Sequence, residues 1–261
     1  MRPIRKANPL APPGFFEAEA AGLAWLGEPA GGVRTARVLE VGPGRIVLER
    51  VVEVLPTRAV AHAFGRALAV THDAGASAFG SPPEPSGAGA PLFIGRRPMP
   101  STPSPTWGAF YARDRVLPFV DLAIEAGDLR DDEAALVRRA CALVAEGAFD
   151  DGDAPARIHG DLWTGNVLWS PEGVVLIDPA AHGGHRETDL AMLALFGCPH
   201  LVEVVAGYEA VHPLRPGWRA RLPLHQLHPL AVHAAGHGRE YGIALADASV
   251  AVLELVEAGV E

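Results

Sequence analysis

The chain has 261 residues, 49% of them hydrophobic, so it can bury the core of one large domain or of two modest ones. Its formal net charge of −9, from 22 basic and 31 acidic residues, argues against a nucleic acid or an anionic membrane as the main partner. The sequence contains neither a signal-peptide pattern nor an apolar run of membrane-spanning length, and we therefore expect a cytoplasmic protein.

The first part of the sequence predicts a small β-rich lobe. Residues 2–6 are expected to form a strand, and apolar side chains recur on one face of a predicted helix over 15–26. Residues 37–41 and 45–51 alternate as strands do, and the Gly-Pro-Gly turn at 42–44 joins them in a hairpin. Neither a helix nor a third glycine follows this turn, so we do not interpret it as a phosphate-binding loop.

The pattern changes near residues 52–57, which predicts a lobe boundary, and the sequence is mainly helical beyond it. The expected helical segments are 59–72, 107–126, 131–146 and most of the chain from 187 onward. Between residues 81 and 105 there are eight prolines, which predict an extended and irregular segment.

Several potential metal ligands are interpreted as structural. Cys141 and Cys198 lack the spacing of a zinc site, and the acidic loop at 150–153 lacks the spaced ligands of a calcium loop. Pro229 is expected to interrupt the helix on which four histidines cluster, and no cysteine or carboxylate is expected to join them. These histidines are His225, His228, His233 and His237.

The most informative stretch is 158–178. Asp161 and Asn166 are five positions apart, which is the spacing of a kinase catalytic loop. Asp161 is therefore the candidate base that orients an attacking hydroxyl group. His159, two positions earlier, is expected to hold the loop through hydrogen bonds and not to act as a base itself.

A hairpin is predicted directly after this loop, around the turn at 170–173. Its register pairs residue 169 with 174 and residue 166 with 177, which brings Asn166 and Asp178 to one end. Facing residues of an antiparallel pair lie roughly 5 Å apart, so an amide oxygen and a carboxylate can share one magnesium ion there.

Phosphoryl transfer from ATP needs this combination, because the reaction depends mainly on positioning and on neutralising the charge of the phosphates. The alternative is structural: Asp161 caps a helix, Asn166 fills a turn and Asp178 ends a strand. Each of these roles is common singly, and the combination of the three residues favours the kinase interpretation.

Lys6 is the only lysine, whereas the other 21 basic residues are arginine. A compact ammonium group fits between phosphates and a carboxylate where a planar guanidinium does not. Glu19 lies on the apolar face of its predicted helix and needs a partner. We predict that Lys6 and Glu19 form the ion pair that positions ATP in kinases; the alternative is a surface lysine and a partly exposed glutamate.

The motifs at 159–166, 177–180 and 184–192 resemble those of the fructosamine kinase (ketosamine-3-kinase) family, within the aminoglycoside phosphotransferase and choline kinase group. The similarity extends over nearly the whole chain. It implies an α+β, two-lobed, protein-kinase-like fold, with a nucleotide-binding lobe at 1–55 and a mainly helical catalytic and substrate lobe at 56–261.

The resemblance also implies roles for individual residues. Asp161 would be the catalytic base, Asn166 and Asp178 would bind Mg²⁺, and Lys6 with Glu19 would serve ATP. The residues implied to support the catalytic loop are His159, Trp163, Arg186, Glu187 and Asp189. The acceptor would be the 3-hydroxyl of a ketosamine, a small sugar-amine, whose phosphorylation leads to deglycation.

Two features depart from the family pattern. Family members usually carry further strands and a glycine-containing phosphate loop before the position of Lys6, so we expect a truncated sheet of about three strands with Lys6 at its edge and weak ATP binding. The segment at 236–241 matches only loosely. An aminoglycoside or amino-alcohol phosphotransferase and a non-catalytic nucleotide-binding relic are the alternatives; the sequence does not indicate an oligomeric state.

Overall fold

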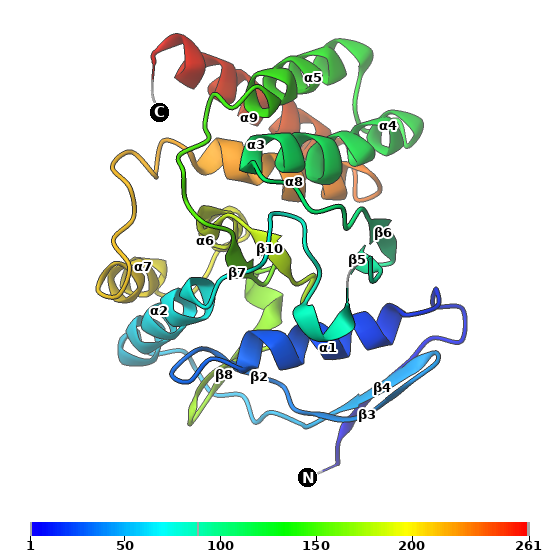
Figure 1. Cartoon of the computed structure of the whole chain (residues 1–261), viewed down its shortest axis with the longest axis vertical. Helices are drawn as coiled ribbons and strands as arrows, with labels where there is room; N and C mark the ends of the chain where they lie inside the picture. The colour runs from blue at the N-terminus through cyan, green and yellow to red at the C-terminus, as the bar shows by residue number, and fades with distance from the viewer. Residues whose placement is uncertain (1, 88, 260–261) are drawn as a thin grey trace.

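The computed structural model describes residues 2–87 and 89–259. A three-stranded antiparallel sheet of order β1-β4-β3 lies at one end of the molecule, with helix α1 (Phe15–Gly27) beside it (Figure 1). Its strands are β1 (Ile4–Ala7), β3 (Val38–Gly42) and β4 (Arg45–Leu48). The predicted three strands are therefore confirmed, and Lys6 lies on an edge strand of this sheet.

Apolar side chains hold α1 against this sheet. Ile46 and Leu48 of β4 pack with Phe16 and Leu23 of the helix, and all four are buried. Val175 of a later strand completes the same cluster. The amino-terminal lobe therefore shares its core with the segment that follows the catalytic loop.

The hairpin predicted after the catalytic loop consists of β8 (Val167–Ser170) and β9 (Gly173–Leu176). Trp169 faces Val174, as predicted, and the amide of Ile177 donates to the carbonyl of Asn166 at 3.2 Å. Strand β2 (Arg34–Thr35) adds to β9 in parallel, so the hairpin is joined to the chain between α1 and β3.

A second strand pair lies on the other side of the catalytic loop. Strands β7 (Ala156–Ile158) and β10 (His182–Gly184) pair antiparallel, with His182 opposite Ile158. The two ends of the segment from 158 to 182 therefore lie side by side. This closure brings the loop at 159–166 and the segment at 177–181 together.

The rest of the molecule is helical, as predicted, and lies on the far side of α1 from the small sheet (Figure 1). Its long helices are α2 (Arg58–Asp73), α5 (Asp131–Ala145), α6 (Arg186–Leu195), α7 (Leu201–Glu209), α8 (Leu222–Ala234) and α9 (Arg239–Glu257). Helices α2 and α7 approach closely because Gly65 and Gly207 face each other's backbones; a Cβ atom at Gly65 would lie 1.8 Å from the carbonyl oxygen of Val204. Among the described residues no helix is long and apolar enough to cross a membrane.

The helical segment expected over 107–126 is confirmed, although it is not one regular α-helix. The segment consists of α3 (Trp107–Phe110), a π-helical stretch (Tyr111–Val116) and α4 (Leu117–Glu125). Pro118 has no N–H group to donate to the carbonyl of Asp114, which instead accepts from Arg115 Nη1 at 3.0 Å. The missing donor and the substitute side-chain donor together explain why the α-helical ladder changes here.

Two further expectations need correction. The proline-rich segment is not wholly irregular, because β5 (Leu92–Ile94) and β6 (Arg97–Met99) form a hairpin within it. Pro229 does not interrupt its helix: α8 continues through it, flanked by the buried side chains of Leu227 and Leu230. Packing of an apolar face outweighs the loss of one backbone donor.

Candidate active site

A cavity of about 500 Å³ is lined by residues of β1, α1, the β5–β6 hairpin, the catalytic loop before β8 and the segment after β9. Six of the residues singled out from the sequence line it: Lys6, Glu19, Asp161, Trp163, Asn166 and Asp178. These residues are separated by up to 172 positions in the chain, and the fold brings them to one place.

The backbone of the catalytic loop is held by buried hydrogen bonds. The amides of His159 and Gly160 donate to the two carboxylate oxygens of Asp189, at 2.8 and 3.0 Å. His159 Nδ1 accepts from the amide of Asp161, and Nε2 donates to the carbonyl of Ile177 at 3.0 Å. His159 therefore ties Asp161 to the strand end that precedes Asp178.

Asp189 is itself oriented by a buried histidine. His72 Nε2 lies 3.1 Å from Asp189 Oδ2, and its Nδ1 lies 2.8 Å from the hydroxyl of Tyr208. Burial alone would raise the pKa of Asp189, but the hydrogen bond and charge interactions with His72 and His159 outweigh it, and the net shift is downward. Asp189 thus remains an ionised acceptor beneath the loop.

Asp161 lies in an environment suited to proton transfer. Burial raises the pKa of its carboxyl group to about 7, and the nearby charges of Asp178 and Asp189 act in the same direction. Asn166 Nδ2 donates to the Asp161 carbonyl at 2.8 Å and to its carboxylate at 3.1 Å, which fixes the side chain and opposes the rise. A carboxyl group with a pKa near the working pH can both accept a proton and release it.

Lys6 and Glu19 form an ion pair with an Nζ to Oε1 distance of 2.7 Å, as predicted. The carboxylate of Asp178 contacts the same ammonium group. Burial alone would lower the pKa of Lys6, but the two carboxylates outweigh it and the pKa is raised. Lys6 is therefore cationic and connects β1 of the small lobe to the segment after β9.

The backbone of Asp178 is strained. Its φ of 53° lies in the left-handed region, which a residue before proline rarely adopts. A Cβ atom added at Gly22 of α1 would lie only 3.1 Å from side-chain atoms of Pro179 and Ala181, so α1 packs directly on this segment. Such strain persists where the surroundings determine the conformation, and it is concentrated at functional sites.

The donor set of the cavity fits a hard divalent cation. Asp178 supplies a carboxylate. The amide nitrogen of Asn166 donates to Asp161, so the amide oxygen of Asn166 is available as a ligand. Both side chains line the same cavity, as the hairpin register predicted. Oxygen ligands of this kind suit magnesium better than zinc.

The other residues expected to support the loop differ in their contacts. Trp163 is 40% exposed, and its ring packs edge-on against Phe196 with centroids 6.4 Å apart. Arg186 bonds to Asp73 and Asp153, at 2.9 and 3.1 Å. It therefore braces α2 and the approach to β7, and within residues 2–87 and 89–259 it forms no hydrogen bond or ion pair with the loop at 159–166.

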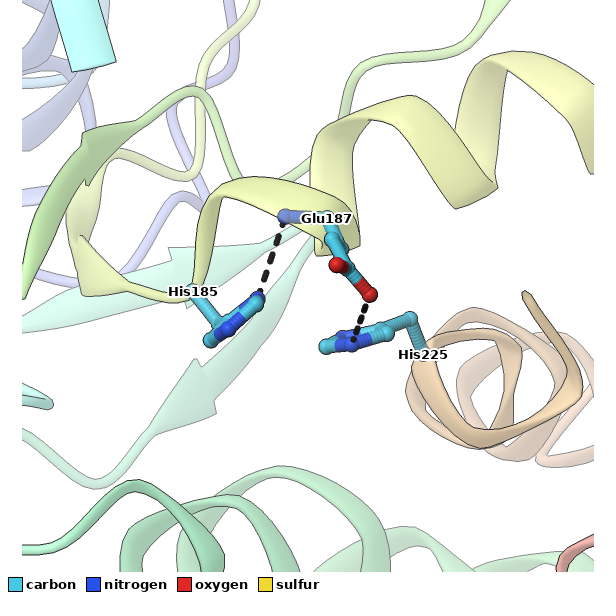
Figure 2. A group of neighbouring side chains, drawn as sticks. All are labelled: His185, Glu187 and His225. Carbon is cyan, nitrogen blue, oxygen red and sulfur yellow. Dashed lines mark hydrogen bonds and ion pairs between the residues drawn. The ribbon is translucent and has the colours of Figure 1, made fainter. Parts of the chain in front are cut away.

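Glu187 belongs to a buried group behind the cavity. It forms a bidentate ion pair with Arg221 at 2.6 and 3.0 Å, and His225 Nε2 lies 3.3 Å from the Glu187 carboxylate. Figure 2 shows His185 and His225 on either side of it. The expectation that no carboxylate joins the histidines of α8 is wrong, because Glu187 does.

This group does not need a metal ion. His185 Nδ1 caps α6 by accepting from the amide of Glu187, and His225 Nδ1 lies 3.1 Å from the hydroxyl of Thr188. The guanidinium of Arg221 already neutralises the carboxylate. A cation would have to compete with that charge, so the interpretation of these histidines as structural stands.

Sequence reasoning missed one wall of the cavity. Leu92, Phe93, Gly95 and Arg96 of the β5–β6 hairpin line it. The signal was present: a glycine followed by one residue between two short apolar runs is typical of a type II′ hairpin turn. The surrounding prolines concealed it.

The fold and the cavity define a class of enzyme: phosphotransferases of the protein-kinase-like fold with an alcohol group as acceptor. A solved structure of aminoglycoside phosphotransferase APH(4)-Ia shares this fold, with a TM-score of 0.59 and 16% identity over 99% of this chain and 87% of the other. The expected fold class is confirmed.

The family follows from sequence. The fructosamine kinase family matches residues 5–254, so the chain belongs to that family. An Enterococcus faecium protein named "Probable ketoamine kinase" is 31% identical over 238 residues, covering 91% of this chain and 82% of its own. A solved Thermobifida fusca structure described as a "putative fructosamine-3-kinase" is 47% identical, with a TM-score of 0.88 and coverages of 96% of this chain and 85% of the other.

Proposed function

We propose that this chain uses ATP to phosphorylate the 3-hydroxyl group of ketosamines such as fructosamines and ribulosamines. The observation that carries the proposal is the convergence of Asp161, Asn166, Asp178 and the Lys6–Glu19 pair on one cavity. The position of the hydroxyl group is taken from the description of the Thermobifida fusca relative as a "putative fructosamine-3-kinase".

In the proposed reaction, Asp161 accepts a hydrogen bond from the acceptor hydroxyl and takes its proton. The acceptor oxygen forms a bond to the γ-phosphorus, the bond from that phosphorus to the β–γ bridging oxygen breaks, and ADP leaves with the electron pair. Asn166 keeps the Asp161 carboxylate in place through its bond of 3.1 Å. Orientation of this kind supplies much of the rate in phosphoryl transfer.

Lys6 is proposed to bind the ATP phosphates, with Glu19 holding its ammonium group. Glu19 is 9% exposed and reaches Lys6 from α1, so displacement of α1 would release the lysine. Asn166 and Asp178 are the proposed Mg²⁺ ligands. A magnesium ion bound there would neutralise charge on the phosphates.

The proposed product is a ketosamine 3-phosphate, in which the linkage between sugar and amine is weakened, so that the amine is released. The reaction would thereby remove sugars from glycated amines. Because the cytoplasm supplies ATP, we place the reaction there. A small-molecule acceptor is also consistent with the formal charge of −9, which disfavours a nucleic acid as partner.

ATP turnover with magnesium across fructosamine, ribulosamine, an aminoglycoside and choline tests the proposal. We expect turnover with the ketosamines, and a phosphate on the 3-oxygen by nuclear magnetic resonance of the product. Turnover only with the aminoglycoside or choline would replace the proposed substrate. ATP binding without turnover of any acceptor would identify a nucleotide-binding protein that is not a kinase.

A further inference from the structure

The cavity contains a second cationic side chain that the proposed reaction does not use. Arg96 lines the cavity, is exposed, and forms no hydrogen bond or ion pair with any residue of 2–87 or 89–259. Lys6, the other lysine or arginine side chain that lines the cavity, is already engaged by the carboxylates of Glu19 and Asp178. Arg96 therefore carries the uncommitted positive charge of the cavity.

The hairpin presents Arg96 from a fixed position. Gly95 and Arg96 form the two-residue turn between Ile94 and Arg97, and the φ of +54° at Gly95 matches a type II′ turn. Ile94 is buried in the helical core together with Leu92 and Met99. The tip of the hairpin thus projects from a packed base.

Two contacts hold the hairpin at its sides. Phe93 packs edge-on against Phe15 of α1, with ring centroids 5.3 Å apart. On the other side, Arg97 Nη2 donates to the carbonyl of Ala235, directly after α8. These anchors place Arg96 between α1 and the end of α8.

The end of α8 is also linked to Trp163, which lines the cavity. Trp163, two residues after Asp161, packs against Phe196, and Phe196 packs against His233 of α8 with centroids 4.7 Å apart. The hairpin and Trp163 are therefore both connected to the end of α8. The hairpin is thereby connected to the part of the cavity near Asp161, which an acceptor has to reach.

The charge of the cavity determines which acceptors can enter. Glu19, Asp161 and Asp178 all line the cavity, so an anionic acceptor meets carboxylates there. A guanidinium group that lines the same cavity offsets that repulsion and offers a planar pair of donors to a carboxylate or phosphate. A neutral acceptor gains nothing from it.

We propose that Arg96 forms a subsite for an anionic group of the acceptor, so that ketosamines bearing a carboxylate or a phosphate are the preferred substrates. This inference rests on the proposed function and adds the substrate class. The shared chemistry is an oxyanion; the carboxylate of a glycated amino acid and the phosphate of a phosphorylated sugar are its two sources.

A matched pair of acceptors tests the subsite. Fructosyl-glycine and fructosyl-glycinamide have nearly the same shape and differ by one negative charge. We expect the wild-type enzyme to use fructosyl-glycine with a kcat/KM about tenfold higher, the usual order for a hydrogen-bonded charged group. Fructosyl-glycinamide carrying a 6-phosphate distinguishes the second source, because a preference for it over fructosyl-glycine assigns the subsite to the sugar phosphate.

Substitutions then assign the preference to Arg96. Arg96→Ala should abolish the discrimination by lowering kcat/KM for the anionic acceptors alone, Arg96→Lys should retain part of it, and Arg96→Glu should favour the neutral acceptor. Arg66→Ala is the matched control, since Arg66 is an exposed residue of α2 outside the cavity and its loss changes the net charge equally.

The outcomes separate the subsite from the proposed function. Equal use of all three acceptors by the wild type, or an equal loss with all three in Arg96→Ala, would overturn the subsite while the kinase assignment stands. An equal loss accompanied by a raised KM for ATP would assign Arg96 to the nucleotide. Absence of turnover with every ketosamine would overturn the proposed function, and the subsite with it.

Discussion

The catalytic loop and the small sheet lobe hold their functional residues in different ways. His72, His159 and Asp189, which brace the loop around Asp161, are at most 1% exposed and are joined by hydrogen bonds within the helical part. Lys6 lies on an edge strand, and the side chains of Lys6 and Asp178 are 29% and 44% exposed.

This difference separates stability from nucleotide binding. A change in the buried network leaves polar groups without partners, which costs folding free energy as well as activity. A change in the exposed ion pairs alters interactions that water already screens, so it affects stability little. Substitutions in the two groups should therefore differ in how much they lower the free energy of unfolding.

The largest effect is expected for the base itself. Asp161→Asn should lower kcat by about 10² to 10⁴, the range for loss of a positioned base. Because burial already disfavours the ionised carboxyl group, the thermal midpoint should not fall. Turnover is measured beside the midpoint; near-normal turnover would remove Asp161 from its assigned role.

The next effect concerns the brace beneath the loop. Asp189→Ala leaves the amides of His159 and Gly160 and the ring of His72 without their acceptor. We expect a loss of roughly 3 kcal/mol in the free energy of unfolding, together with reduced kcat. Unfolding in denaturant measures this loss. The control is Asp132→Ala, because Asp132 is an exposed aspartate outside the buried network. A loss confined to kcat would contradict the structural role.

A smaller effect, mainly on nucleotide binding, is expected at the partly exposed Lys6. Lys6→Met should lower kcat/KM for ATP about tenfold or more, because a charge-assisted contact to phosphate is lost. The free energy of unfolding should fall by about 1 kcal/mol, less than for Asp189→Ala, because Lys6 and Asp178 are partly exposed to water whereas the buried Glu19 loses its cation. Lys6→Arg separates charge from shape. If Lys6→Arg matches the wild type, a compact ammonium group is not required.

The smallest effect is the pH dependence set by Asp161. Its pKa of about 7 predicts that kcat/KM rises with pH up to about 7 and then levels, since the ionised form accepts the proton. The sign for stability is opposite. The folded state holds this proton more tightly than the unfolded state, so this contribution to stability falls as pH rises from the ordinary value of 3.8 through 7. Asp161→Asn should lose both dependences, and an unchanged pH profile would contradict the assignment.

Local features of the site could be predicted from the sequence. The hairpin register follows from alternation around a short turn, and the Lys6–Glu19 pair follows from a carboxylate on an apolar helix face with one lysine available. Contacts that join distant segments could not. His72 meets Asp189 across 117 positions, and Glu187 meets Arg221 across 34, with no local pattern to indicate either.

The backbone of Asp178 could not be predicted either. Nothing in the residues around it signals a left-handed conformation, since a following proline favours extended backbone. The residues that follow it, Pro179 and Ala181, pack against α1, a contact between distant segments that no local pattern indicates. The β5–β6 hairpin escaped prediction for the opposite reason: a local turn signal was present, and the proline content around it outweighed that signal.

The parallel pairing of β2 with β9 has a mechanical consequence. Arg34 and Thr35 pair with Val175 and Leu176, and the amide of Ala36 donates to the carbonyl of Leu176 at 3.0 Å. We expect this two-residue pairing to act as a pivot: if the small sheet rotated about it, β1 would move over the cavity while the pairing stayed at a nearly constant distance from Asp178. Hydrogen exchange at Ala36 should accordingly be slow and insensitive to nucleotide, whereas exchange along β1 should slow when ATP is added.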